Sequence, residues 1–258
     1  MSISTNLANR VRHTSLPKSA GLMPLFEAVV NSIHSIEEAD VSMDAGKIVV
    51  EILRDSQVNL QLASDAGGPG REPVGEILGF KVTDNGVGFN DANIESFKTL
   101  DSDHKASKGC RGVGRLLWLK AFDRVHVSSD FLQPDGELLR RNFDFSAAAG
   151  VSGESVIPSP EGVLRGTTVH LDGFREIYRD SSRKTAEAIS RHLFEHCLWY
   201  FIRPGGAPTI LLRDGEEYIN LDDVCAGSLH SGAIPESVVI KDVNFELTHV
   251  KLRTNTAQ

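Results

Sequence analysis

The chain has 258 residues, of which 40% are hydrophobic and 24% charged, so it is long enough and apolar enough to bury a substantial core. Its net charge of −8 argues against the class of protein whose main role is to coat nucleic acid. It has no run of 18 apolar residues and no apolar signal-peptide core near residue 1, so we expect neither a membrane span nor a secretory signal.

The first predicted elements are a helix and a set of strands. Residues 22–38 carry apolar side chains at i, i+3, i+4 and i+7, the spacing of a helix with one core-facing stripe. Residues 47–54 and 77–84 are predicted strands, and 58–63 is a weaker candidate. The Gly- and Pro-rich residues 64–76 predict a loop between them.

The middle of the chain alternates between short helices and strands. We predict helices at 91–99, 115–122 and 181–202, a Gly- and Lys-rich loop at 102–114, strands at 124–132, 136–146 and 164–174, and a hairpin at 208–221 around Asp214-Gly215. After Val224 the pattern changes to a polar, Gly-rich stretch followed by one or two strands within 237–252. We therefore expect one domain over residues 1–225 and the truncated start of a second over 226–258.

Four motifs carry residues suited to chemistry. In the first helix, Glu27 and Asn31 are i, i+4 neighbours and project together. An Asn carbonyl suits a hard cation such as Mg²⁺, and a Glu one turn away can activate water as a general base. The alternative is a solvated polar face on an ordinary amphipathic helix.

The second motif lies at the end of strand 77–84. An ionised Asp84 accepts hydrogen bonds only, as needed to hold an exocyclic amino group, and Gly86 and Gly88 leave backbone exposed to a flat ring. The alternative is an Asn-Gly turn.

The third motif is the run Gly109-x-x-Gly112-x-Gly114 before helix 115–122. Its spacing matches neither a P-loop nor a dinucleotide-binding fingerprint. It still offers backbone N–H groups, a helix N-terminus and nearby cations, which suits phosphate. The alternative is a flexible loop before a core helix.

The fourth motif is Gly166-Thr167 on strand 164–174, where the Thr167 hydroxyl is a candidate member of the Asp84 network. The alternative is an ordinary strand of β-branched residues.

The four motifs, taken in order, resemble the GHKL superfamily of ATPases, which includes gyrase B, the ninety-kilodalton heat-shock chaperone, sensor histidine kinases and MutL. The matching segments are LFEAVVNSIHS, VTDNGVGF, KGCRGVGRLLWLKAF and RGTTVHL. The resemblance covers roughly residues 20–215 and is nearest to the MutL-like and chaperone-like branches.

The resemblance implies an α+β two-layer sandwich, a mixed and mostly antiparallel sheet with helices on one face. It implies that ATP lies between the helices and a lid formed by residues 100–114. Asp84 would bind the adenine amino group, Thr167 would support it through water, Asn31 would coordinate Mg²⁺ and Glu27 would activate the attacking water. Gly86 and Gly88 would let the ring approach, and the phosphates would meet Lys108, Gly109, Arg111, Gly112, Val113 and Gly114.

Two departures from the family pattern bear on this expectation. His34 and Ser35 stand where many clamp-type relatives carry an acidic and a small apolar residue, and Ser35 would face the nucleotide. The lysine that reaches the γ-phosphate from the following domain in gyrase- and MutL-type relatives has no clear counterpart. We therefore expect tight ATP binding and weak hydrolysis by residues 1–258.

The resemblance leaves several functions open. ATP binding would close the lid and drive homodimerisation or another conformational switch, with a protein or DNA partner contacted through other regions. The alternatives are a nucleotide-sensing regulatory module without turnover, and a histidine protein kinase. Because Cys110, Cys197 and Cys225 include no C-x-x-C pair, we expect free thiols and a cytoplasmic protein.

Overall fold

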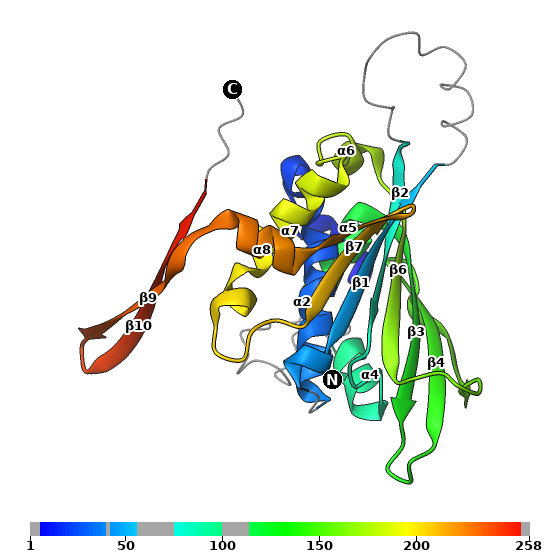
Figure 1. Ribbon diagram of the computed structural model, residues 1–258. Coiled ribbons are helices and arrows are strands. Elements are labelled where there is room, and N and C mark those ends of the chain that lie inside the picture. The colour runs from blue at the N-terminus through cyan, green and yellow to red at the C-terminus, as the bar shows by residue number, and fades with distance from the viewer. Residues whose placement is uncertain (1–5, 40–41, 56–74, 100–113, 254–258) are drawn as a thin grey trace.

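The computed structural model describes residues 6–39, 42–55, 75–99 and 114–253 (Figure 1). Within these ranges the chain forms an α+β fold in which helices cover one face of a large, mostly antiparallel sheet, as the sequence predicts. The helices are α1 (Leu7–His13), α2 (Met23–Glu38), α4 (Asp91–Lys98), α5 (Gly114–Ala121), α6 (Glu176–Arg179), α7 (Ala186–Ile202) and α8 (Leu221–Ser228), with 3₁₀ turns η1 (Lys18–Ala20) and η2 (Met43–Ala45).

The main sheet has the strand order β5-β4-β3-β6-β2-β1-β7-β8. Only β1 and β7 run parallel among the described strands, and the other neighbours are antiparallel. Its strands are β1 (Lys47–Arg54), β2 (Ile77–Asp84), β3 (Phe122–Leu132), β4 (Leu138–Ser146), β5 (Gly150–Pro158), β6 (Gly166–Phe174), β7 (Thr209–Asp214) and β8 (Glu217–Asn220). A separate hairpin joins β9 (Leu229–Ile240) to β10 (Val243–Leu252).

The core lies between the sheet and helices α2, α5 and α7 (Figure 1). The apolar stripe of α2 is fully buried, with Phe26 and Ile33 both 0% exposed, and it meets the inward side of β1 and β2. Trp118 of α5 packs beside it and donates its indole N–H to the carbonyl of Pro24 at 3.0 Å. Burying each such side chain stabilises the fold by about 1.5–3 kcal/mol, which fixes α2 against the end of β2.

The other face of the sheet is polar. Residues in register across six strands form a row of charged and imidazole groups, namely Arg213, Glu51, Lys81, His170, His126 and Asp144. Lys81 and Glu51 approach to 3.7 Å, and His126 Nδ1 lies 3.0 Å from Asp144 Oδ1. This row accounts for the two-layer architecture, because such a face has little apolar surface to bury under further helices.

The predicted helices and strands are largely confirmed within the described residues. The prediction for 181–202 begins too early, because the Thr185 side chain accepts from the Ala188 N–H and α7 starts at Ala186. Elements α1, β5, α6 and α8 were not predicted, and β9 begins at Leu229, inside the stretch predicted to be polar and Gly-rich ahead of strands within 237–252. The strand predicted at 58–63 and most of the predicted loop at 64–76 lie outside the described residues.

The C-terminal part bears on the predicted division at residue 225. Helix α8 crosses that boundary and is anchored by Leu221, which is 0% exposed. The β9–β10 hairpin follows it and projects away from the sheet and helices (Figure 1). The structure thus shows a sheet of its own after residue 228, and a second domain there stays a prediction. None of the helices in the described ranges has the length and apolarity that a membrane crossing requires.

Candidate nucleotide site

Asp84 is the last residue of β2 and is only 7% exposed. Its Oδ2 accepts the Ser32 hydroxyl at 2.7 Å, and its Oδ1 accepts the Gly86 N–H at 2.9 Å. The backbone N–H of Thr167, its register partner on β6, also reaches the carboxylate. Burial raises the pKa of Asp84 to about 6, while the bonds from Ser32, Gly86 and Thr167 oppose that rise.

The turn after β2 is packed tightly between α2 and β3. Val87 N–H donates to the Ser35 carbonyl at 3.0 Å, and a Cβ on Gly86 would lie 2.6 Å from that carbonyl carbon. Gly88 has a φ of +80°, and a Cβ there would lie 2.6 Å from the Asp130 carbonyl oxygen. Both glycines are therefore required by the protein's own packing, whereas their contact with an adenine ring stays a prediction.

Asn85 fixes the same turn from the other side. Its side chain accepts from Lys47 N–H and donates to the Ala45 carbonyl, both at 2.8 Å. These two bonds fasten the turn to the segment that enters β1. The Asn-Gly turn is thus present and its asparagine has a structural role, whereas a binding role for Asp84 stays a prediction.

Ser129 of β3 is a further part of the network and is 0% exposed. Its hydroxyl accepts from the Phe89 N–H at 2.8 Å and lies 2.9 Å from the Thr167 hydroxyl. Thr167 therefore donates its backbone N–H to Asp84 and shares a hydrogen bond between its hydroxyl and that of Ser129. The predicted water between Thr167 and Asp84 remains a prediction.

Glu27 lies on α2 two turns before Ser35 and is partly buried. A Cβ on Gly114 would overlap its carboxylate and lie 3.1 Å from the carboxyl carbon, so the start of α5 touches Glu27. Burial raises the pKa of Glu27. On the α7 side, burial and then the charge of Glu27 raise the pKa of the Cys197 thiol to about 12.

The predicted site residues thus fall into two groups, one residue between them, and a set outside the described residues. The structure brings together Ser35, Asp84, Gly86, Gly88 and Thr167 at the end of β2, and it pairs Glu27 with Gly114 at the start of α5. Asn31 lies between these two groups along α2 and is exposed. The remaining predicted phosphate contacts lie outside the described residues: Lys108, Gly109, Arg111, Gly112 and Val113.

The chain also offers a limited set of oxygen ligands for a cation. Within the described ranges, no three His, Cys, Asp or Glu side chains converge as a metal site. Mg²⁺ commonly uses one or two protein oxygens and completes its shell with water and substrate phosphates. The exposed Asn31 amide fits this mode of binding. The described residues do not form a site that would hold Mg²⁺ with protein ligands alone.

Arg115, the second residue of α5, serves the structure. Its guanidinium donates to the carbonyls of Thr99 at 2.6 Å and Ser96 at 3.3 Å at the end of α4, and it lies 5.1 Å from the Phe97 ring centroid. The sequence places it among the cations near the predicted phosphate loop. In the structure it fastens α4 to α5.

Sequence reasoning missed Ser32 and Ser129. Ser32 had a signal, because it occupies a position in the apolar stripe of α2 between Val29 and Ile36, where a hydroxyl needs a buried partner. Ser129 had no such signal in the sequence, since a serine in an alternating strand is ordinary.

No protein-family model and no curated protein matches this chain.

Proposed function

We propose that the chain binds ATP with Mg²⁺ and hydrolyses it, with the adenine at Asp84 and the phosphates toward Asn31, Glu27 and the start of α5. The observation that carries the proposal is Asp84 itself. A carboxylate on a buried strand end is costly unless it is hydrogen-bonded or serves a ligand. Its three protein donors leave part of its acceptor capacity for the amino group of a purine.

The residues would divide the work along α2. Ser32 holds Asp84 oriented, Asn31 offers a carbonyl oxygen to Mg²⁺, and Glu27 takes a proton from water. The raised pKa of Glu27 suits that step, because a general base works best when its pKa approaches the working pH. Bound Mg²⁺ would neutralise phosphate charge. Gly114 leaves room for the Glu27 carboxylate beside α5.

The binding part is tested by calorimetric titration with a non-hydrolysable ATP analogue, with and without Mg²⁺. Asp84→Asn replaces an acceptor by a partial donor, so we expect affinity to fall by about a hundredfold, the equivalent of one charge-assisted hydrogen bond. Asp172→Asn is the matched control, because Asp172 lies on the polar face of β6. Equal affinities for the wild type and Asp84→Asn would refute the adenine site.

The hydrolytic part is tested separately by single-turnover measurement with Glu27→Gln. We expect analogue binding to persist and turnover to fall by about 10²-fold or more, the usual contribution of a general base. Glu195→Gln, at an exposed position of α7, is the control. Binding with an unchanged rate in Glu27→Gln would assign the chain to the nucleotide-sensing class without turnover.

The same proposal includes ATP-dependent dimerisation as the output of binding. Light scattering with and without the analogue measures it directly. A monomer in both states would remove dimerisation from the proposal and leave the binding site intact.

A further inference from the structure

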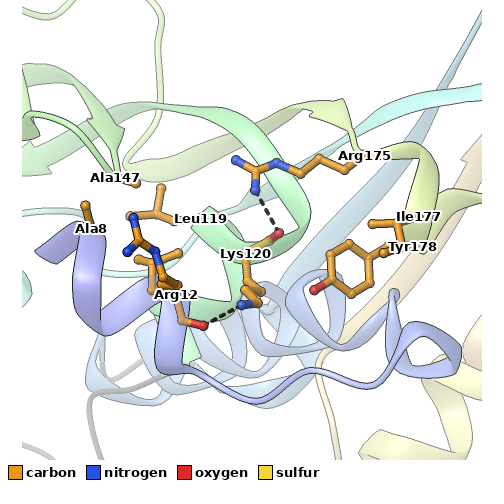
Figure 2. A pocket seen from close by; sticks show the side chains of 9 residues that line it. Ala8, Arg12, Leu119, Lys120, Ala147, Arg175, Ile177 and Tyr178 are labelled. Atoms are coloured by element: carbon orange, nitrogen blue, oxygen red, sulfur yellow. Dashed lines mark hydrogen bonds between the residues drawn. The ribbon is translucent and has the colours of Figure 1, made fainter.

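A cavity of about 380 Å³ lies at the C-terminal end of α5, beside Leu119 and Lys120 (Figure 2). Its walls are α1, the last turn of α5, α6 with its preceding residue, and Ala147 in the turn after β4. Leu119 and Tyr178 form a buried apolar part, at 1% and 7% exposure. None of its lining residues belongs to the candidate nucleotide site.

The cationic side chains at this cavity are Arg12, Lys120 and Arg175. Lys120 Nζ donates to the Arg12 carbonyl at 2.8 Å, and the Arg175 guanidinium lies 3.4 Å from the Lys120 carbonyl (Figure 2). These bonds hold the three residues around one space. The cavity therefore has a rim of positive charge over an apolar floor.

Only one of the three cations has an acidic partner among the described residues. Arg175 pairs with Asp123 at 2.9 Å. Arg12 and Lys120 have no carboxylate within ion-pair distance in the part of the chain that the structure describes. No carboxylate of the described residues therefore neutralises the charge of these two cations at the cavity.

We propose that this cavity binds a small organic anion, one that carries a single phosphate or carboxylate on a compact apolar body. The volume lies in the range of small-molecule sites, about 300–1,000 Å³. Arg12 and Lys120 would bind the anionic group, and Leu119, Ile177 and Tyr178 would contact the apolar body. A bare inorganic anion would leave that apolar surface wet.

The test is a titration of the full chain with four probes: phenyl phosphate, benzoate, inorganic phosphate and benzyl alcohol. We expect phenyl phosphate or benzoate to bind about tenfold or more tightly than inorganic phosphate and benzyl alcohol, because each comparison removes one of the two kinds of contact. The better of phenyl phosphate and benzoate identifies the anionic group. Absence of binding, or equal binding of inorganic phosphate, would overturn the proposal.

Variants locate the site. Arg12→Gln and Lys120→Gln should each weaken binding by about tenfold, whereas Arg124→Gln, on the polar face of β3, should not. Asp84→Asn should bind the probe as the wild type does, which separates this site from the proposed nucleotide site. Methyl chemical shifts of Leu119, Ala147 and Ile177 in the wild type provide a readout that needs no variant. Shifts elsewhere, or unchanged binding in both Gln variants, would refute the cavity as the site.

Discussion

At the scale of single residues, Asp84 shows how a carboxylate is kept in a protein interior. Desolvation opposes its charge, and donors from three different elements, α2, the turn after β2, and β6, support it. The balance leaves its pKa near the middle of the accessible pH range, so both stability and binding should respond to pH.

The pH dependence follows from the direction of that shift. The pKa of Asp84 is about 6 in the folded chain and ordinarily 3.8, so the folded state holds a proton that the unfolded state releases between these values. The shifted pKa of Asp84 therefore contributes fully to the free energy of unfolding below the unfolded-state pKa of 3.8. This contribution is lost as the pH rises through about 6. The loss is on the order of 3 kcal/mol.

The Asp84→Asn variant has no titrating group at this position, so its unfolding free energy should not show the loss that Asp84 causes as the pH rises. Denaturant unfolding of both proteins at pH 4, 5, 6 and 7 measures the effect, because the other carboxylates cancel in the difference. We expect the unfolding free energy of the variant, relative to the wild type, to rise across this series. A constant difference would show that Asp84 is not the titrating group.

The Ser32 hydroxyl is the donor most open to a clean test. Ser32→Ala leaves one oxygen of a buried carboxylate without its partner, so we expect the unfolding free energy at pH 7 to fall by about 1–3 kcal/mol and the pKa of Asp84 to rise further. Ser190→Ala is the control. Ser190 is equally buried but donates to the Glu187 carbonyl within its own helix, so a smaller loss is expected. Equal losses of unfolding free energy in the two variants would mean that the hydrogen bond from Ser32 to Asp84 stabilises the fold no more than the bond from Ser190 to the Glu187 carbonyl.

At the scale of elements, the turn after β2 is the point where α2, β2 and β3 meet. Gly86→Ala places a methyl group against the Ser35 backbone, which cannot move without displacing α2. We expect the unfolding free energy to fall by about 1–3 kcal/mol, the usual cost of overpacking. Urea denaturation measures this change.

Gly227→Ala is the matched control for that substitution. Gly227 lies in α8 with open space around its Cβ position, so alanine should raise the unfolding free energy by about 0.5–1 kcal/mol. If Gly86→Ala also raised the unfolding free energy, the result would contradict a tight contact between the turn and α2.

The elements that the sequence predicts correctly are those whose periodicity reflects a buried face. Helix α2 and strands β1 and β2 each repeat apolar residues at the spacing of their structure, so their bounds follow closely. Strand β5 lies at the sheet edge with most of its side chains exposed, and it has no such alternation. Helix α8 is short and is defined by its Asn220 cap, which a sequence pattern signals only weakly.

The residues of the candidate site likewise divide into those that the sequence predicts and those that only the folded structure brings together. Asp84, Glu27 and Thr167 were predicted because each belongs to a motif that is continuous in the chain. The link between Thr167 and Ser129 joins residues 38 positions apart through strand register, and no local pattern encodes it. The contact between Glu27 and Gly114 likewise depends on how α5 packs on α2.

At the scale of the whole molecule, the main sheet and the β9–β10 hairpin form separate sheets. The hairpin exposes apolar side chains such as Val239 and Phe245, at 70% and 46%, and pairs only with itself among the described strands. We expect a chain that ends at residue 228 to keep its unfolding free energy within about 1 kcal/mol, because little core is lost.

A chain that ends at residue 220 is the matched comparison. It lacks α8 and the fully buried Leu221, so its unfolding free energy should fall by about 2 kcal/mol or more. Thermal and urea unfolding of the two truncated chains beside the full chain measure both effects. A similar loss in both would show that the hairpin contributes to the stability of the main sheet.

Helix α5 continues into β3 with no intervening residue, since Ala121 ends one and Phe122 begins the other. This single stretch touches Glu27 at Gly114, borders the cationic cavity at Lys120, and supports the Asp84 turn at Ser129. The helical part spans about 12 Å. The candidate nucleotide site and the cationic cavity therefore border one continuous segment, with no loop between its helix and its strand.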